Sequence, residues 1–553
     1  MPSSKVALFA AGSNAHGQLG NGTLDDSNVF NQCLFSISDS IGGGVLIPDL
    51  VAMTLDHSKL TVTSSPKVNL DRKLFKPTLP HAAFHSPDYN TNIIKVASGS
   101  NHTILLLGHH ISNHDSYYDS KTSPTFNVVY GSGDSSKGQL HPRQGSTNAS
   151  QSTRFERIHL AHEAQGYHVV DIATAWETSY FVLRHLLHPD QNPDLLITIG
   201  CNDFGERARA QSPVPSDARS DGGGSRKGKG KASNGTVGMM HEHIVSFDHL
   251  LRAPDDTLPF HISSITASVH HAIAILESPP ALPPRQIITG WGACRHGQLG
   301  PQVAPPPCPL RDGAKTTPPL TFISTPTQLL SVSNDPVRHV GTGVQHTVLI
   351  HESGTITAWG SNRKHQLQGV SSESDVTDVE CTWNGTYLIS TSGSSSWSVL
   401  ATGSGEKGQL GRANSTGSAE GSSSLSRGSS SGARPSTPSI LVDPILAPVN
   451  FPFDQIRLTK RVIKLSCGSE HVLALLQDTN GQTELWGWGW NEHGNLGQGH
   501  ERDIHQPTLL DMPGSLKAGM GARVSHRIVN TWAGCGTSWI AVEIDKDSLQ
   551  TLT

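Results

Sequence analysis

The chain has 553 residues, of which 35% are hydrophobic and 16% are charged, and it is rich in glycine and proline, with 55 and 34 residues respectively. This composition excludes a coiled coil or a helical bundle and is typical of many short strands joined by turns. The formal net charge of −5 lacks the basic excess of proteins that hold duplex DNA through its phosphates, so we expect no strong direct DNA binding.

The cysteines and the apolar segments indicate the compartment. Seven cysteines form no Cys-x-x-Cys pair and are odd in number, which favours reduced thiols over a disulfide framework or a zinc site. The apolar run 6–11 is too short for a signal sequence, and no stretch approaches the roughly 18 apolar residues of a membrane span. We therefore expect a protein of the cytoplasm and the nucleus that makes no membrane contact.

Two patterns alternate along the chain. The first has two or three apolar residues, a glycine, a short polar stretch and an ending similar to Gly-Gln-Leu-Gly. Its copies lie at 8–20, 128–140, 196–208, 287–300, 356–369, 399–411 and 484–497. The second has apolar residues at alternate positions, a glycine or small-residue break and a β-rich apolar run, which predicts strand, turn and strand. Its copies lie at 93–107, 169–183, 262–276, 337–350, 376–389, 462–476 and 527–542.

Each pair of patterns predicts about four short strands in one twisted antiparallel sheet. A lone sheet of this size cannot bury both faces, and closing seven sheets into a ring protects their edges. The sequence therefore predicts an all-β fold, a monomeric seven-bladed β-propeller of four-stranded antiparallel blades, over residues 5–543 as a single domain. The units assigned to blades are approximately 5–107, 128–183, 195–276, 287–350, 356–389, 398–476 and 484–543.

Long inserts interrupt the repeat. They are predicted at 21–92, 209–261, 301–336 and 412–460, where the distance between equivalent positions exceeds that of a bare blade. Two segments within them, 212–238 and 412–439, are rich in serine and glycine and are predicted to be disordered. Surface loops of this kind cost little to close, so we interpret the inserts as tolerated additions to the ring.

The repeat resembles that of the regulator-of-chromosome-condensation family of seven-bladed propellers. The resemblance rests on two recurring motifs and covers nearly all of the periodic sequence. These motifs are Gly-Gln-Leu-Gly at 17–20, 297–300 and 408–411, and Gly-x-x-His at 99–102, 343–346 and 468–471. Some copies depart from the pattern: residues 204–207 lack the Gln-Leu, and His365 stands where glycine is expected. The resemblance implies a docking platform for other proteins and no enzyme.

Within that family, the first copy at 8–20 and the last copy, which includes "GWGWNEHGNLG" (487–497), resemble the fungal alpha-tubulin suppressor or killer-toxin-insensitivity branch. This resemblance implies an adaptor that partners a small zinc-binding electron-carrier protein. The implied processes are diphthamide synthesis and Elongator-dependent modification of the tRNA wobble uridine.

Two alternatives remain open from the sequence. One is a guanine-nucleotide exchange factor for a Ran-type small GTPase associated with chromatin; it predicts a basic N-terminal tail, whereas residues 1–5 hold one lysine. The other is a scaffold whose partner is not assigned. The co-purifying partner, a small zinc protein or a small GTPase, distinguishes the hypotheses.

No catalytic residue, cofactor site or metal site is expected. The histidines that invite such an interpretation occupy one repeat position, where an imidazole can bond groups in a turn, whereas catalytic groups sit in one asymmetric place. They are His102, His271, His346 and His471. No Walker-type phosphate loop is present.

The tryptophans supply the candidate partner site. Trp291, Trp359 and Trp486 are assigned to one strand position and are predicted to be core, whereas Trp488 and Trp490 are predicted to extend into the turn. Trp176 and Trp383 share a position in the second-pattern turn, and exposed aromatic rings in turns are frequent interface anchors. For Trp490 a cap packed on the neighbouring turn is the alternative. The partner-binding candidates are Trp488, Trp490, Glu492, His493, Trp176 and Trp383.

Overall fold

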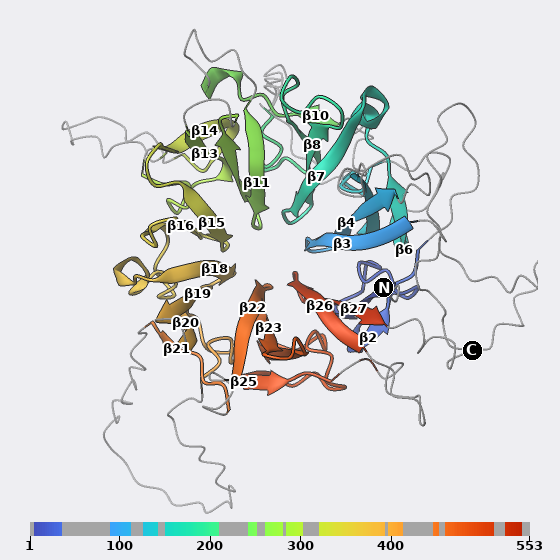
Figure 1. Ribbon diagram of the computed structural model, residues 1–553, viewed down its shortest axis with the longest axis vertical. Helices are drawn as coiled ribbons and strands as arrows, with labels where there is room; N and C mark the ends of the chain where they lie inside the picture. Colours follow the sequence, from blue (N-terminus) through green and yellow to red (C-terminus); the bar gives the residue numbers. More distant parts are fainter. Residues whose placement is uncertain are drawn as a thin grey trace, which may run out of the picture.

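The computed structural model forms a ring of seven antiparallel sheets around a central channel (Figure 1), which confirms the seven-bladed propeller. Among the described residues, six sheets have four strands and one has three. The structure describes residues 5–35, 89–111, 125–141, 150–209, 242–250, 260–279, 284–301, 303, 320–392, 396–412, 446–452, 459–511, 513 and 526–544. The segment 212–238, and 412–439 apart from its first residue, lie outside the described residues.

We number the blades in chain order, each from the channel outwards. Blade 1 holds β3 (Tyr89–Ser98), β4 (His102–Ile111), β5 (Thr125–Asp134) and β6 (Gln151–Ile158). Blade 2 holds β7 (Tyr167–Thr174), β8 (Thr178–His185), β9 (Leu195–Gly200) and β10 (His243–Ile244). Blade 3 holds β11 (His261–Ala267), β12 (His271–Glu277), β13 (Gln286–Ala293) and β14 (Phe322–Val332), and blade 4 holds β15 (Val337–Thr342), β16 (His346–His351) and β17 (Ile356–Gly360).

Blade 5 holds β18 (Val376–Thr382), β19 (Gly385–Ser392), β20 (Ser396–Gly403) and β21 (Ala447–Pro448). Blade 6 holds β22 (Lys460–Cys467), β23 (His471–Asp478), β24 (Thr483–Gly489) and β25 (Ile504–Leu509). Blade 7 holds β26 (His526–Ala533) and β27 (Thr537–Ile544), followed outwards by β1 (Lys5–Gly12) and β2 (Ser27–Gln32). Three short 3-10 helices complete the described elements: η2 (Ala161–Gln165), η3 (Asp248–Leu250) and η4 (Val370–Ser372).

The sheets are offset from the sequence units by two strands. Each sheet takes its two inner strands from a second-pattern copy and its third strand from the next first-pattern copy, so the first sheet spans 89–158 and not 5–107. The fourth strands follow these copies, and β2, β10, β14 and β21 lie within the segments predicted as the inserts 21–92, 209–261, 301–336 and 412–460, which corrects that prediction in part. The last sheet joins the two ends of the chain, because β1 pairs with β27 and Leu8 lies opposite Ala541. Hydrogen bonds between β1 and β27 thus close the ring, and no strand edge opens at the junction of the termini.

A glycine ends the third strand of every blade with a positive φ angle. At Gly489, for example, φ is 104° and an added Cβ would lie 2.6 Å from the carbonyl oxygen of Glu470. The third strand therefore passes close to the backbone of the turn between the two inner strands. Only glycine fits this approach without strain, which explains why a glycine recurs in each first-pattern copy.

The four repeat histidines are fully buried and connect neighbouring blades. In each case Nε2 lies within hydrogen-bonding distance of a hydroxyl on the next blade. The pairs are His102 with Ser179 at 3.0 Å, His271 with Thr347 at 3.3 Å, His346 with Thr386 at 3.1 Å and His471 with Ser538 at 2.9 Å. Burial lowers the pKa of His102 and His271 to about 3 and that of His346 and His471 to about 4, so the imidazoles are neutral at pH 7.

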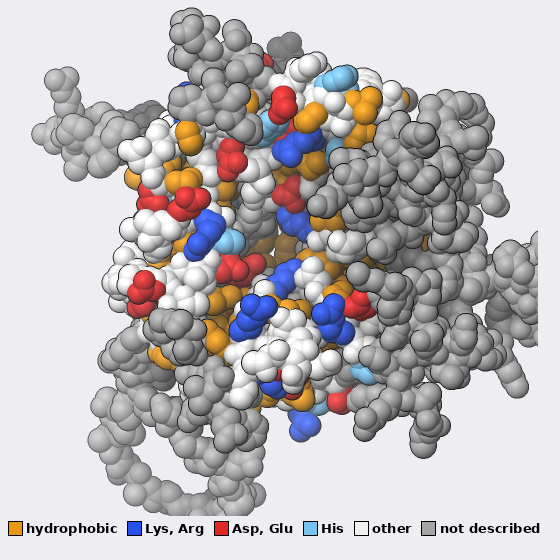
Figure 2. All heavy atoms as spheres, in the orientation of Figure 1, with side chains coloured by type: hydrophobic (Ala, Val, Ile, Leu, Met, Phe, Trp, Pro, Cys, Tyr) orange, Lys and Arg blue, Asp and Glu red, His pale blue; other side chains and the backbone are white. Residues whose placement is uncertain are grey.

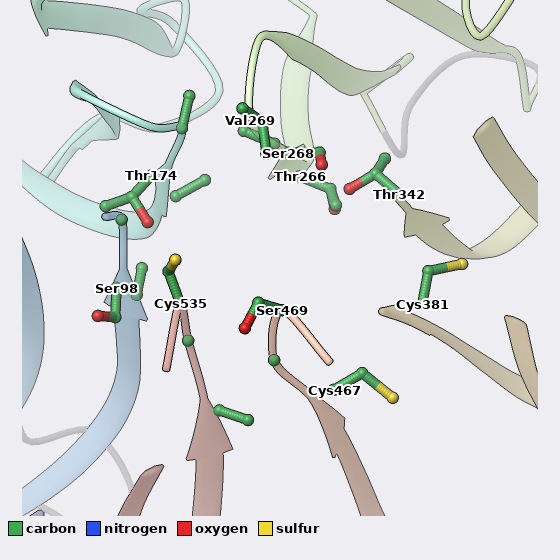
Figure 3. Close-up of a pocket in the computed structure, with 18 of the residues that line it drawn as sticks. Ser98, Thr174, Thr266, Ser268, Val269, Thr342, Cys381, Cys467, Ser469 and Cys535 are labelled. Atoms are coloured by element: carbon green, nitrogen blue, oxygen red, sulfur yellow. The ribbon is translucent and has the colours of Figure 1, made fainter. Parts of the chain in front are cut away.

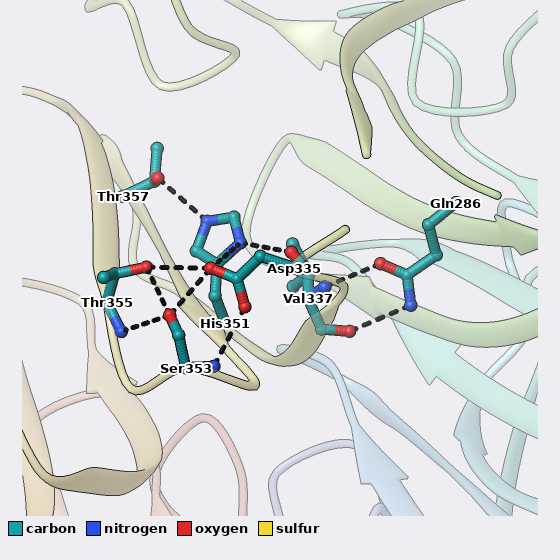
Figure 4. A network of polar contacts seen from close by, with 7 residues as sticks. All are labelled: Gln286, Asp335, Val337, His351, Ser353, Thr355 and Thr357. Carbon is teal, nitrogen blue, oxygen red and sulfur yellow. Dashed lines mark hydrogen bonds and ion pairs between the residues drawn. The ribbon is translucent and has the colours of Figure 1, made fainter. Parts of the chain in front are cut away.

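A polar network joins blades 3 and 4 (Figure 4). The side chain of Gln286 on β13 accepts a hydrogen bond from the backbone of Val337 at 2.7 Å and donates one to its carbonyl at 3.0 Å. Next to it, Asp335 accepts hydrogen bonds from the backbone and hydroxyl of Ser353, which lower the pKa of the Asp335 carboxyl. The side-chain amide of Gln286 thus bonds both backbone groups of Val337, as a neighbouring strand would. It links two blades that otherwise pack through side chains.

Candidate functional site

Trp488 is a core residue, which corrects its prediction as a partner contact. It is fully buried on β24 opposite Val472, just as Trp291 on β13 lies opposite Ala272. Each of the two indoles donates Nε1–H to a backbone carbonyl at the end of the preceding blade. Trp291 reaches Glu206 at 2.7 Å and Trp488 reaches Gln409 at 2.8 Å. Trp488, and not Trp486, therefore holds the repeat position of Trp291.

Trp486 is also buried, as predicted, but two residues earlier on the same strand. It packs against Phe451, with ring centroids 5.9 Å apart in an edge-to-face arrangement. The alternation of tryptophan and glycine thus places two large rings in the core of blades 5 and 6, because residues two apart on a strand point to the same face.

Trp490 lies at the tip of blade 6 and is only partly buried. Its Nε1–H donates to Glu492 at 3.1 Å, and its ring makes a T-shaped contact with the ring of His493, with centroids 5.1 Å apart. His493 Nδ1 in turn lies 2.7 Å from a carboxylate oxygen of Asp26 in blade 7. The structure therefore brings together Trp490, Glu492 and His493, and it ties them to the neighbouring turn while leaving part of the indole accessible.

Trp176 and Trp383 meet across the ring. Trp176 is at the tip of the β7–β8 hairpin and Trp383 at the tip of the β18–β19 hairpin, and their ring centroids are 5.8 Å apart. Hydrogen bonds between hairpin tips narrow this end of the channel. Ser100 N donates to Trp176 O at 3.1 Å, Trp176 N to Val269 O at 3.0 Å, and Trp383 N to Ser469 O at 2.8 Å. The two indoles consequently cover the channel mouth.

A cavity of about 400 Å³ lies at this mouth, and we call it the mouth pocket. Its lining includes Trp176, Trp383, Trp490, Glu177, Asp134 and His493. Four of the predicted candidates thus share one pocket: Trp176, Trp383, Trp490 and His493. Glu492 adjoins it through its hydrogen bond to Trp490, whereas Trp488 is buried in the core.

The two carboxylates of the mouth pocket were not predicted. Asp134 is held by Ser136, whose backbone N–H and hydroxyl donate to it at 2.9 and 2.6 Å. The partly buried side chain of Glu177 makes no hydrogen bond or ion pair with any residue that the structure describes. Both carboxylates could have been found from the sequence. Glu177 directly follows the candidate Trp176, and Asp134 follows Gly133 just as Trp490 follows Gly489, so Asp134 and Trp490 hold the same repeat position.

A second cavity, of about 300 Å³, lies in the channel (Figure 3), and Trp176 and Trp383 contribute to its lining as well. Hydroxyl groups and the thiols of Cys381, Cys467 and Cys535 surround the central space. Burial raises the pKa of Cys381 and Cys467 and brings that of Cys535 to about 11. The thiols are therefore protonated at neutral pH, which removes the thiolate that nucleophilic or redox chemistry requires.

Charged side chains circle the channel, and Figure 2 shows basic and acidic groups around the central opening. The innermost strand of every blade has a register irregularity against its neighbour at one equivalent position, for example between Ile93 and Lys95 of β3. Three pairs at this position span neighbouring blades: Lys95 Nζ lies 2.7 Å from Asp171, His339 Nδ1 lies 3.2 Å from Asp378, and Lys464 Nζ donates to Asn530 at 2.7 Å. These charged side chains are thus largely paired with groups on the neighbouring blade.

The described residues carry no recognisable metal site or membrane segment. No group of three or more His, Cys, Asp or Glu residues among them is placed to hold a metal ion. No helix within the described ranges is long and apolar enough to span a bilayer.

Sequence profiles of the regulator of chromosome condensation (RCC1) repeat match residues 483–526, and residues 337–366 and 462–495. The chain is 27% identical over 281 residues to the Secretion-regulating guanine nucleotide exchange factor of Bos taurus, covering 47% of this chain and 52% of the relative. It is 26% identical over 279 residues to the Ultraviolet-B receptor UVR8 of Arabidopsis thaliana, covering 48% of this chain and 49% of the relative. The matches thus span about half the length of these curated relatives.

Among solved structures, human WBSCR16 is similar with a TM-score of 0.52 and 15% sequence identity. The alignment covers 97% of this chain and 99% of that structure. At this level of identity the likeness shows the fold alone.

Proposed function

We propose, from the premise that the chain is built of RCC1 repeats, that it is a non-catalytic protein-interaction propeller of the cytoplasm and the nucleus that docks its partner on the mouth pocket. The observation that carries the proposal is the set of three indoles at that pocket. Trp176 remains 37% exposed. Trp176 and Trp383 share a turn position that small residues fill in other blades, such as Ser100 and Ser469. The fold therefore does not require these rings, whereas interfaces use such rings as anchors.

Two partner classes follow from different sources. The resemblance of the first and last repeat copies supports an adaptor for a small zinc-binding electron-carrier protein, acting in diphthamide synthesis and Elongator-dependent tRNA modification. The bovine and murine relatives are named Secretion-regulating guanine nucleotide exchange factor, which supports nucleotide exchange as the second class. For this class we propose a small GTPase of the Ran type as the partner.

A single affinity experiment separates these classes. The full chain, carrying an affinity tag, is purified from cells of its source, and the co-purifying proteins are identified by mass spectrometry. A small zinc protein supports the adaptor and a small GTPase supports the exchange factor. For the second class, nucleotide release from purified Ran is then measured with and without the chain, and an unchanged release rate excludes it.

The same purification with the double variant Trp176→Ser/Trp383→Ser tests the docking surface. The matched control is Leu187→Ser, which removes a side chain that is 74% exposed and does not line the pocket. We expect the double variant to lose the partner and the control to retain it. Equal recovery by all forms contradicts the proposed surface.

A further inference from the structure

We propose that the mouth pocket receives an arginine side chain from the partner protein. This inference deepens the proposed function and rests on it, since the arginine belongs to a segment of the docked partner. The aromatic rings, the charges and the shape of the pocket support it.

Three indole rings offer aromatic surface at the mouth pocket. The rings of Trp176 and Trp383 are tilted by 42° with centroids 5.8 Å apart, so their faces are not stacked on each other. The ring of Trp490 is held in place by its hydrogen bond to Glu492 and by a T-shaped contact with the ring of His493. Tryptophan is the side chain that attracts a cation most strongly through the face of its ring, within about 6 Å of the centroid. Three such rings at one pocket make a surface for a cation.

The charges point in the same direction. No lysine or arginine is among the described residues that line the mouth pocket, whereas Glu177 and Asp134 are. The remaining titratable groups of the lining are two histidines and Cys535. His493 lies against Asp26 at 2.7 Å, and His16 Nδ1 accepts a hydrogen bond from Gln151 at 3.2 Å. A carboxylate without a partner beside indole faces is the complement of a positive charge.

The geometry favours a guanidinium over an ammonium group. A guanidinium is planar, can stack on an indole face and directs its N–H groups outwards in the plane towards a carboxylate such as Glu177. An ammonium group is compact and strongly hydrated, and therefore loses more hydration when it lies against apolar rings. The volume of about 400 Å³ accommodates the guanidinium together with the apolar stem of the side chain.

The test uses the intact chain and three short peptides. Acetyl-Gly-Arg-Gly-amide is titrated against the protein while tryptophan fluorescence and indole N–H resonances are followed; the lysine and citrulline analogues are titrated in parallel. We expect saturable binding of the arginine peptide with a Kd of about 1–10 mM, at least about threefold weaker binding of the lysine peptide, and no saturation with citrulline, which keeps the shape but lacks the charge.

Two variants assign the binding to the pocket. Glu177→Gln and Trp176→Ser are each expected to weaken the arginine peptide by about fivefold or more. Glu352→Gln is the matched control, since this carboxylate is exposed on the β16–β17 turn and does not line the pocket. Thermal unfolding of each variant verifies that the fold is intact.

The outcomes separate the inference from the proposed function. Equal binding of citrulline and arginine peptides, or unchanged binding by Glu177→Gln, overturns the arginine site. If the partner depends on Trp176 and Trp383 while no arginine peptide binds, the docking surface stands and the arginine site falls. If the arginine peptide binds but the double variant captures the partner normally, the pocket is a cation site and the proposed docking surface falls.

Discussion

The indole rings of Trp176 and Trp383 lie with their centroids 5.8 Å apart, although they belong to blades 2 and 5 of the ring. Blades 3 and 4 separate them along the chain, so their contact exists only because the hairpin tips converge on the channel axis. The pair covers the channel cavity on one side and contributes to the mouth pocket on the other.

From this position we predict that the double variant Trp176→Ser/Trp383→Ser weakens partner binding and leaves the stability of the fold nearly unchanged. Serine occupies the same turn position at Ser100 and Ser469, and the backbone hydrogen bonds between tips do not involve the indoles. We expect the free energy of partner binding to weaken by about 2–4 kcal/mol, as for two aromatic anchors, with little change in thermal stability. Calorimetric titration and thermal unfolding measure the two effects, and a large loss of stability contradicts the prediction.

Trp488 and Trp490 are predicted to respond in opposite ways to alanine. Trp488→Ala removes a fully buried ring and its hydrogen bond to Gln409, so the free energy of unfolding falls by about 3–5 kcal/mol. Trp490→Ala leaves stability nearly unchanged and weakens partner binding by about 1–2 kcal/mol. Denaturant unfolding and partner titration of the two variants test this contrast. Unchanged partner affinity in a folded Trp490→Ala protein would assign Trp490 to packing alone.

The periodic residues of the sequence predict the sheets and their number, because recurring glycines and alternating apolar residues are local requirements of a blade. The phase of the repeat is not local. A period gives the same spacing whichever strand begins a blade, so the pairing of β1 with β27 and the offset of the sheets were not predicted. Trp486-Gly487-Trp488-Gly489 allows two alignments two residues apart, which is why Trp486 was assigned the position that Trp488 holds.

The candidate site was partly predictable for the same reason. Two tryptophans at one shared position of the second-pattern turn are visible in the sequence, and this shared position identified Trp176 and Trp383. Their contact with each other, and the nearness of Trp490, depend on the width of the ring at the channel mouth. Glu177 and Asp134 line the mouth pocket only because of this three-dimensional arrangement.

The buried histidines predict a loss of stability in mild acid. Burial lowers the pKa of His471 to about 4, whereas an unfolded histidine has a pKa near 6.5. The unfolded state therefore binds more protons below pH 6.5, and stability falls as the pH decreases towards the folded pKa. Between pH 7.5 and 5.5 each such histidine costs about 1.4 kcal/mol.

The variant His471→Thr tests this account, because Thr178 and Thr537 occupy the same repeat position in blades 2 and 7. We expect the variant to be less stable at pH 7.5, since the contact with Ser538 is lost, but to lose about 1.4 kcal/mol less than the wild type between pH 7.5 and 5.5. Urea unfolding at several pH values measures both slopes. Parallel slopes would show that His471 does not carry the acid sensitivity.

Glu380 predicts the opposite dependence on pH. Burial and the neighbouring Asp378 raise the pKa of this channel carboxyl from 4.5 to about 8, with Lys464 opposing the shift. A folded pKa above the unfolded value stabilises the protein fully below pH 4.5, and this contribution is lost as the pH rises towards 8. Glu380→Gln removes the titration, so its gain in stability over the wild type is expected to grow by about 3 kcal/mol from pH 5 to pH 7.5. Urea unfolding across this range measures the gain, with exposed Glu352→Gln as the matched control. A gain that does not change with pH would contradict the buried titration of Glu380.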